Sequence, residues 1–228
     1  MTQRTVPILG IIGGVGSGKS TLAAWLSDQL SVVVLDADAA GHEALRDDAV
    51  RVALRHEFGA EVFDATGQVD RSRLATKVFG DGPDFSAARR RLEAIVHPVI
   101  RHRLEQQMAD IRRHGDSDLI ILDAAVMMEA CWNELCDVVV FVDTPRSMRL
   151  QRVAASRGWN EAELNRREAS QWSLDRKRHA ANAVIDNSGP IDQAGPELLS
   201  FLVSRFPTLT PGRTGAALAT AGSSDTLP

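Results

Sequence analysis

The stretch GGVGSGKST, from Gly13 to Thr21, decides the fold because it contains the spacing G-x-x-x-x-G-K-[ST] of a phosphate-binding loop. Its glycines permit positive φ angles, so backbone N–H groups can turn inward around anionic oxygens at the start of the following helix. Lys19 is expected to reach the β- and γ-phosphates of a nucleotide, and the Ser20 hydroxyl to ligate Mg²⁺. The alternative is a glycine-rich turn with an exposed lysine.

The segments on either side of this loop favour the phosphate-binding interpretation. An apolar run of strand length, residues 6–12, leads into the loop, and apolar residues recur at helical spacing from Leu22 to Leu30. A signal peptide cleaved at that run would destroy the loop. We therefore interpret the N-terminal run as the first strand and expect a cytoplasmic protein.

The composition is that of an ordinary soluble globular protein. Hydrophobic residues make up 44% and charged residues 25% of the chain, and the net charge of −4 argues against a general nucleic-acid coat. No apolar run reaches the roughly 20 residues that span a bilayer, so we expect no membrane partner. Two cysteines, Cys131 and Cys136, cannot form a disulfide framework or a complete zinc site, and we expect both in or near the core.

Five apolar runs predict the strands of a parallel sheet. After the first run they cover residues 32–35, 119–122, 137–143 and 183–186. Their hydrophobicity is continuous rather than alternating, which is typical of strands buried on both faces. A closing helix is expected over residues 195–206. The pattern predicts an α/β fold with a five-stranded parallel sheet.

A long segment without strands interrupts this α/β pattern. Residues 39–113 have helical periodicity, and the last predicted helix is interrupted at His97-Pro98 because proline lacks a backbone donor and disfavours helix at the preceding residue. We predict a helical lobe inserted into the core. From Pro207 to Pro228 the residues are mostly small or polar, which predicts a disordered tail.

Carboxylates follow two of the predicted strands, at the sheet edge where ligands bind in parallel α/β folds. Asp36 and Asp38 follow the second strand, and Asp123 follows the third. Phosphoryl transfer to an alcohol needs a carboxylate that orients or accepts the hydroxyl proton, and oxygen ligands around Mg²⁺. Beside a phosphate-binding loop we favour Asp38 and Asp123 for these roles, with Asp36 a weaker candidate. The alternative is that each aspartate caps a helix.

The segment from residue 146 to residue 178 is strongly basic in a chain that is acidic overall. It has nine arginines and lysines against four acidic residues, a local charge of +5. Arginine recognises phosphate in a planar, bidentate manner, so the segment is typical of a mobile lid over a triphosphate. Arg152 and Arg157 are the best candidates for phosphate contact, whereas Arg176 and Arg178 are expected on the surface. The alternative is a solvated helix face with many ion pairs.

The order of motifs resembles the dephospho-CoA kinase family over roughly residues 8–189. Members of this family use ATP to phosphorylate the 3′-hydroxyl of the dephospho-CoA ribose. The phosphate-binding loop is shared by many kinases, and the later motifs in this order are more specific. Besides the loop, the similar segments are LDAD at 35–38, FG at 58–59, GQVDRSRLATKVF at 67–79, IVHPVI at 95–100, SQ at 170–171 and VIDNSG at 184–189.

The resemblance implies a three-layer P-loop kinase fold with an inserted helical substrate lobe and a helical lid. A single kinase domain would cover residues 1–206, and residues 207–228 would form the disordered tail. The expected parts of the domain are a core at 5–38, 118–145 and 183–206, a CoA-binding lobe at 39–114 and a lid at 146–180.

The resemblance also implies roles for individual residues. Asp38 would act as the base on the acceptor hydroxyl, with Lys19 and Arg152 as further catalytic residues and Ser20 as the ligand of Mg²⁺. The residues expected to contact ATP are Gly14, Val15, Gly16, Ser17, Gly18, Lys19, Ser20, Thr21, Arg152, Arg157 and Asn187. The residues expected to contact the acceptor are Asp38, His42, His97, Asp123 and Glu129.

The chain departs from the family's usual pattern after the third strand. The family usually has Pro-Leu-Leu-aromatic-Glu there, whereas this chain has AAVMME. Glu129 is retained, Ala125 replaces the proline, and Met127 and Met128 replace a leucine and a bulkier apolar residue. His42 stands where arginine is common. Because methionine packs adaptably, we expect a changed pocket wall and an unchanged reaction.

The sequence therefore predicts an ATP- and Mg²⁺-dependent kinase of dephospho-CoA, with a small-molecule substrate and no nucleic-acid partner, present as a monomer or weak homo-oligomer. One alternative is a kinase of another nucleoside or nucleotide, which residues 67–79 and IVHPVI argue against. The other is a non-catalytic nucleotide-binding regulator, which would not need Asp38 or the basic segment.

Overall fold

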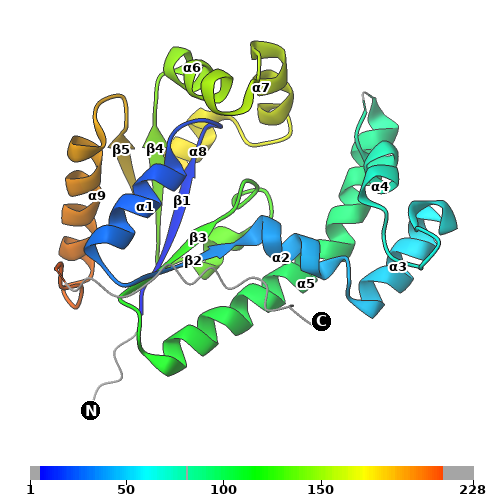
Figure 1. The fold of residues 1–228 in the computed structure, drawn as a ribbon, viewed down its shortest axis with the longest axis horizontal. Helices are drawn as coiled ribbons and strands as arrows, with labels where there is room; N and C mark the ends of the chain where they lie inside the picture. The colour runs from blue at the N-terminus through cyan, green and yellow to red at the C-terminus, as the bar shows by residue number, and fades with distance from the viewer. Residues whose placement is uncertain (1–5, 81, 213–228) are drawn as a thin grey trace, which may run out of the picture. The chain divides into compact units, whose positions relative to one another are not determined.

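A central parallel β-sheet organises the chain, with the strand order β2-β3-β1-β4-β5 (Figure 1). The structure is a computed structural model and describes residues 6–80 and 82–212. Continuous apolar runs form the strands, and the predicted α/β class and five-stranded parallel sheet are confirmed. The strands are β1 (Ile8–Gly13), β2 (Val32–Asp36), β3 (Leu119–Asp123), β4 (Val138–Asp143) and β5 (Ala183–Asp186).

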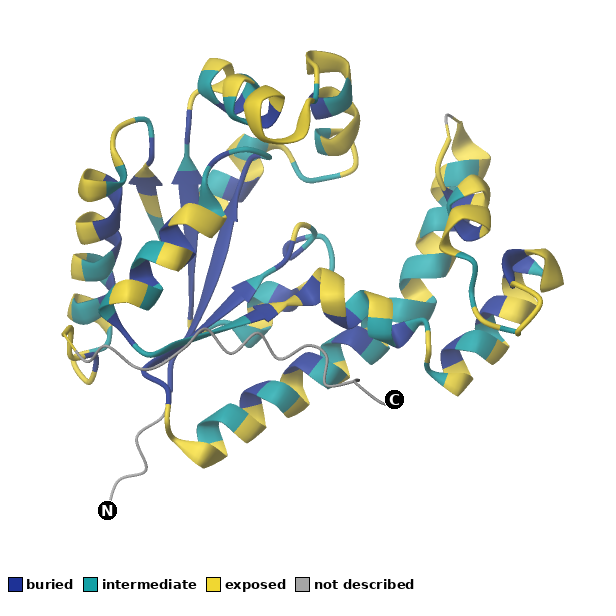
Figure 2. Cartoon of the chain, viewed as in Figure 1, coloured by how far each residue is buried: buried dark blue, intermediate teal, exposed yellow. Residues whose placement is uncertain are grey.

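Helices α1 (Lys19–Gln29) and α9 (Ile191–Arg205) cover one face of the sheet and pack against each other. Alternate residues of β1, Leu9 and Ile11, point toward this layer and are fully buried with Leu26 of α1. The other β1 residues belong to the opposite face, where α8 (Leu174–Ala180) packs against β1. The sheet is therefore the middle of three layers, and Figure 2 shows its strands largely buried.

The parallel register brings the carboxyl ends of the strands together. Asp36, the last residue of β2, lies opposite Asp123 of β3, and Asp143 of β4 lies opposite Asp186 of β5. Gly13 at the end of β1 lies opposite Val142, at the centre of the same edge. The phosphate-binding loop thus leaves the sheet between two acidic strand ends.

Three helices connect β4 to β5 and occupy the segment predicted as a lid. They are α6 (Arg146–Arg157), α7 (Glu161–Glu168) and α8. Gly158 ends α6 with φ of 67°, a left-handed conformation that glycine adopts without strain, and the Asn160 side chain then caps α7. The outer faces of α6 and α7 are exposed (Figure 2).

Among the described residues, those from 37 to 107 form a second compact unit, while residues 6–36 and 108–212 form the first. The second unit contains α2 (Ala37–Ala44), α3 (Asp48–Phe58), the 3₁₀ turn η1 (Ala60–Val62), α4 (Arg71–Val78) and most of α5 (Pro83–His114). Its own apolar core includes Leu54, Val62 and Val78, all fully buried. The inserted helical segment is therefore a packed unit in its own right.

Helix α5 corrects one sequence prediction, because it continues without interruption through Pro98. A proline within a helix removes one hydrogen bond, the one that its own nitrogen would donate. The remaining bonds of this long helix and the packing of Leu104 and Met108, both buried, keep the helix intact.

Two further predictions are corrected in the first unit, one for the tail and one for a cysteine. Leu209 is buried in the core, and the Gly212 N–H donates to the Gln29 carbonyl, so the predicted disordered tail does not begin at Pro207. Residues 213–228 of that predicted tail lie outside the described residues. Cys131 is exposed with φ of 56° rather than in or near the core, whereas Cys136 is half-buried.

No helix within residues 6–80 and 82–212 has the length and apolarity that a membrane span requires. This agrees with the absence of long apolar runs from the sequence.

Candidate active site

The phosphate-binding loop joins β1 to α1 in the conformation that its glycines predict. Gly16 and Gly18 have φ of 78° and 89°, and Gly18 lies at the N-terminus of α1. A Cβ on Gly16 would lie 2.8 Å from the Arg149 carbonyl oxygen, so close packing also requires glycine there. The Ser17 N–H donates to the Gly14 carbonyl at 3.1 Å and closes the turn. The loop therefore presents backbone N–H groups at a helix N-terminus, a suitable cradle for phosphate.

Lys19 lies inside a cluster of cations. Its ammonium group donates to the carbonyls of Gly13 and Gly14, each at 3.3 Å. Its pKa is lowered to about 8, chiefly by withdrawal from water and to a smaller extent by Lys177, Arg157 and Arg149, while Asp123 partly opposes the shift. Three cations and the Asp123 carboxylate therefore act on this ammonium group.

Three side chains hold the back of the loop through a single carbonyl group. The Ser17 carbonyl accepts hydrogen bonds from Thr144 Oγ1 at 3.0 Å, Arg152 Nη1 at 3.2 Å and Asn187 Nδ2 at 2.7 Å. Arg152 Nη2 also donates to the Asn187 carbonyl at 3.1 Å. Arg152 and Asn187, both predicted ATP contacts, are thus brought to the loop, where they bind its backbone.

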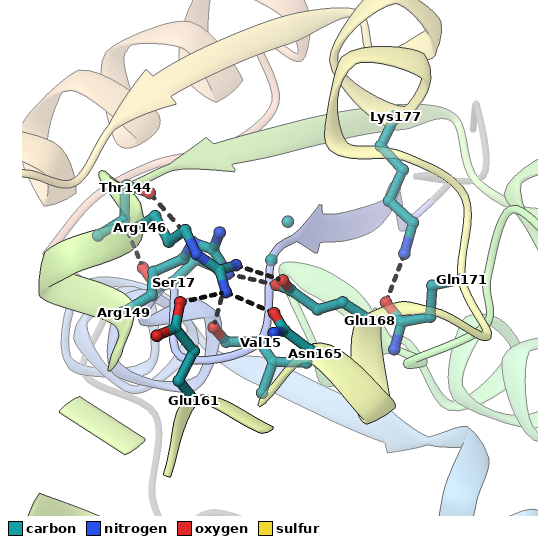
Figure 3. A network of polar contacts seen from close by, with 12 residues as sticks. Val15, Ser17, Thr144, Arg146, Arg149, Glu161, Asn165, Glu168, Gln171 and Lys177 are labelled. Carbon is teal, nitrogen blue, oxygen red and sulfur yellow. Dashed lines mark hydrogen bonds and ion pairs between the residues drawn. The ribbon is translucent and has the colours of Figure 1, made fainter. Parts of the chain in front are cut away.

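Arg149 reaches the same loop at a second point (Figure 3). Its guanidinium donates from Nε to the Thr144 carbonyl and from Nη1 to the Val15 carbonyl, both at 3.2 Å. The same Nη1 binds Glu168 at the end of α7. The Arg149 side chain is only 3% exposed, so this ion pair connects the lid segment to the loop through the protein interior.

Glu129 binds the segment leading to α8. Its Oε1 lies 3.4 Å from Lys177 Nζ and accepts a hydrogen bond from the Trp172 N–H, while Lys177 also donates to Gln171 Oε1 at 2.8 Å. Burial lowers the pKa of Lys177, although Glu129 and Glu168 partly offset this effect. Glu129 Oε2 is buried and has no hydrogen-bond partner among the described residues.

The remaining arginines of the basic segment divide between aromatic stacking and ion pairs. Arg157 and Arg167 stack on the ring of Trp159 at 4.8 and 5.0 Å. Arg146 binds Glu161 at 3.1 Å on the exposed side of α7. Both interpretations of the segment therefore apply, since some cations lie at the loop and others form a solvated ion-pair face. Arg176 is exposed, as predicted, and Arg178 is half-buried and pairs with Asp143.

Three predicted acceptor contacts belong to the second compact unit. Asp38 lies exposed in the first turn of α2, directly after β2, and His42 lies exposed in its last turn. His97 is half-buried in α5, and its burial lowers its pKa although Glu93 opposes the shift. Asp123, in contrast, belongs to the first unit and acts electrostatically on Lys19.

The methionines that depart from the family's pattern are core residues. Met127 and Met128 are 0% and 3% exposed. A Cβ on Gly10 would lie 2.8 Å from the Met127 sulfur and 2.8 Å from that of Cys136, which places both sulfurs against β1. Met127 therefore fills space against β1, and the changed pocket wall stays a prediction.

Sequence reasoning missed Arg149, Thr144 and Glu168 as residues that hold the loop. Their partners lie far away in the sequence, so no local motif reveals them. One signal was available, because Arg149 precedes the buried Val153 by four residues and therefore lies on the buried face of α6. A cation on an apolar helix face requires a buried partner.

Three features together define a P-loop kinase. They are a parallel sheet with a phosphate-binding loop after its first strand, cations around the loop lysine, and a basic helical segment after β4. The chain belongs to the dephospho-CoA kinase family, whose model matches residues 7–193.

Individual relatives agree with this assignment. The chain is 38% identical over 205 residues to a dephospho-CoA kinase of Rhodopirellula baltica, covering 88% of this chain and 94% of the relative. It is 34% identical over 201 residues to the enzyme of Geobacter sulfurreducens, covering 88% and 99%. A Thermus thermophilus crystal structure is similar with a TM-score of 0.70 and 31% identity, covering 87% of this chain and 97% of that one.

Proposed function

We propose that this chain transfers the γ-phosphoryl group of ATP to the 3′-hydroxyl of the dephospho-CoA ribose, forming CoA and ADP. The observation that carries the proposal is the complete phosphate-binding loop with Lys19 at the start of α1, in a chain of the dephospho-CoA kinase family. In the reaction the acceptor oxygen bonds to the γ-phosphorus, the bond to the β,γ-bridging oxygen breaks, and the acceptor proton leaves with a base.

The loop and its cations are proposed to hold the triphosphate. N–H groups of the loop would surround the β-phosphate, and Lys19 would exchange its contacts with the Gly13 and Gly14 carbonyls for phosphate oxygens. Arg157 would approach the phosphates from the end of α6, and Arg152 and Asn187 would border the nucleotide from behind the loop. Charge spread over the transferred phosphoryl group would meet preorganised donors, which lowers the barrier.

The oxygen donors at the sheet edge fit Mg²⁺. Ser20 is exposed at the start of α1, and Asp36 and Asp123 end neighbouring strands. The described residues contain no cluster of three or more His, Cys, Asp or Glu able to hold a metal by themselves. Mg²⁺ is usually held by one or two protein oxygens together with substrate phosphates and water, so this sparse set suits it. When bound, Mg²⁺ would neutralise phosphate charge, with Ser20 as its protein ligand.

Asp38 is proposed as the base. It follows β2 within the first turn of α2, and a carboxylate at this position can accept a proton from the acceptor hydroxyl. The unit of residues 37–107 is proposed as the acceptor lobe, with His42 and His97 as contacts. Asp123 and Glu129 would contact the acceptor from the first unit, and α6 to α8 would serve as the lid.

The decisive experiment measures ADP formation from Mg-ATP with dephospho-CoA, adenosine and several nucleotides as separate acceptors. We expect turnover with dephospho-CoA, a product phosphorylated at the 3′-position, and an almost complete loss of turnover in Asp38→Asn with ATP binding unchanged. Asp48→Asn, which alters an exposed aspartate of the same unit, is the control.

Two outcomes would overturn the proposal. Preference for another acceptor would support a kinase activity but refute dephospho-CoA as its substrate. Tight ATP binding without turnover on any acceptor would indicate a nucleotide-binding regulator.

A further inference from the structure

We propose that Arg149 is a positioning residue that aims a backbone N–H of the phosphate-binding loop, and that Glu168 couples this residue to helix α7. The inference rests on the proposed function for its kinetic consequences. Its structural part, a connection between α7 and the loop, can be tested with ATP alone.

The argument starts from the peptide bond between Val15 and Gly16. In a trans peptide the C=O and N–H groups point in opposite directions, so a side chain that holds the carbonyl also fixes the N–H. Arg149 Nη1 donates to the Val15 carbonyl at 3.2 Å. The Gly16 N–H is therefore directed away from the guanidinium, as a donor to a phosphate in the cradle must be. The clamp on the Ser17 carbonyl fixes the Gly18 N–H by the same rule.

The two anchored peptides differ in what holds them. The Ser17 carbonyl is bound by Thr144 and Asn187, which follow β4 and β5, and by Arg152 of α6. The Val15 carbonyl is bound by Arg149 of α6, whose carboxylate partner belongs to α7. Arg149 is 3% exposed and packs against Gly14, where a Cβ would lie 2.7 Å from Nη1. The guanidinium thus fills the space behind the loop and has little freedom to rotate independently of it.

Glu168 connects Arg149 of α6 to helix α7. It is the last residue of α7, its side chain is 20% exposed, and it binds Arg149 with one oxygen and Arg146 with the other, the latter at 3.4 Å (Figure 3). Arg149 Nη1 is shared between Glu168 and the Val15 carbonyl. Displacement of α7 therefore alters the hydrogen bond that orients the loop, and by linkage nucleotide bound to the loop alters the stability of α7.

Arg146 supplies a matched control. It is an arginine of the same helix with the same acidic partner, but its side chain is 44% exposed and it contacts Glu161, Asn165 and Glu168 on α7. Removal of its charge perturbs the α6–α7 ion pairs and leaves the Val15 carbonyl bound. Any effect that is specific to Arg149 must then arise at the loop.

The first experiment measures backbone hydrogen exchange of residues 161–168 with and without Mg-ATP in the full chain. We expect ATP to change protection of this segment in the unaltered protein and in Arg146→Gln, and the change to be lost in Arg149→Gln and Glu168→Gln. An unchanged response in Arg149→Gln and Glu168→Gln would overturn the coupling, and so would no response in the unaltered protein. This readout needs no acceptor, so it stands even if the proposed reaction fails.

The second experiment separates positioning from a merely structural role. Arg149→Gln should raise the dissociation constant for Mg-ATP about tenfold, the loss expected for one charge-assisted hydrogen bond, with the KM for dephospho-CoA unchanged. Arg149→Lys keeps the charge but lacks the planar fork that binds two carbonyls and a carboxylate, so it should recover only part of this affinity. A lower melting temperature with an unchanged ATP dissociation constant in Arg149→Lys and Glu168→Gln would assign the pair to stability alone and overturn the proposal.

Discussion

The two compact units of this chain use polar residues in opposite ways. In the first unit, Ser17, Arg149, Lys177 and Asn187 are buried, and their bonds converge on the phosphate-binding loop and the segments around it. In the unit of residues 37–107 the buried residues are apolar, and the ion pairs lie on the surface.

This difference separates rigid from adaptable parts of the proposed enzyme. Buried polar bonds are costly to break, so the loop that we propose binds the triphosphate is preorganised before nucleotide arrives. A helical unit held by apolar packing leaves its polar surface available to change with little effect on its fold. The comparison predicts that the chemistry of the donor depends on single buried residues, whereas the fold of the second unit depends on its apolar core.

The strongest test of the comparison is Lys19→Ala. Removal of the only ammonium group predicted to contact the transferred phosphoryl should lower kcat with dephospho-CoA roughly 10³-fold or more, as with other groups that stabilise developing charge. Lys77→Ala, which removes an exposed lysine of the second unit paired with Glu61, should leave kcat nearly unchanged. Steady-state ADP release measures both variants, and comparable losses in the two would contradict the comparison.

The second test removes a core side chain from each unit. Leu54→Ala in the second unit should cost about 3 kcal/mol of unfolding free energy, because Leu54 is fully buried and the cavity cannot collapse completely. ATP should still bind to the folded fraction with its original affinity, since the loop belongs to the first unit. Leu26→Ala, at an equally buried position in α1, should weaken ATP binding as well. Denaturant unfolding and calorimetric ATP titration provide the two quantities.

A weakening of ATP binding by Leu54→Ala equal to that of Leu26→Ala would show that the two units respond as one.

The third test uses pH to examine the loop lysine. Since the pKa of Lys19 is about 8, its ammonium form declines above that pH, and kcat/KM for Mg-ATP should fall by up to about tenfold per pH unit. Bound phosphate stabilises the charged form, so kcat should decline at a higher pH than kcat/KM. Lys19→Arg keeps its charge throughout this range, and its basic limb should be absent. A basic limb shared by both proteins would assign the titration to another group.

The same pKa predicts the sign of a stability effect. Between pH 8 and pH 10.5 the unfolded chain retains the Lys19 proton that the folded chain has lost. The contribution of Lys19 to unfolding free energy therefore rises with pH through this window and is absent below it.

The sequence was most informative where one local pattern determines the structure. Strand 119–122 was predictable because a run buried on both faces is apolar throughout, and the loop because its glycines require positive φ. Pro98 misled the prediction, since the rest of a long packed helix outweighs one missing hydrogen bond. The burial of Leu209 was also missed, because a single apolar residue in a polar segment gives no periodic signal.

The candidate site divides in the same manner. Lys19 and Ser20 come from a contiguous motif, and spacing was sufficient to find them. Arg149 and Glu168 belong to separate helices and bind each other. The Val15 carbonyl that Arg149 also binds is more than a hundred residues away in the sequence. No spacing rule predicts a contact that depends on how helices pack, so these residues could be recognised only in the fold.

The smallest expected effect concerns the surface of the second unit. Arg103 pairs with Glu43 at 3.4 Å and with Asp47 at 3.6 Å, and all three side chains are about a third to a half exposed. Water and salt screen such pairs, so Arg103→Gln should cost only about 0.5 kcal/mol of unfolding free energy, less at high salt. Asp47 also accepts from the Ala49 and Val50 N–H groups as the cap of α3, so Asp47→Ala should cost about 1 kcal/mol more. Urea unfolding at two salt concentrations measures both changes. A salt-independent loss of several kcal/mol in Arg103→Gln would mean that the second unit, like the first, relies on polar bonds shielded from solvent, and the contrast between the units would fail.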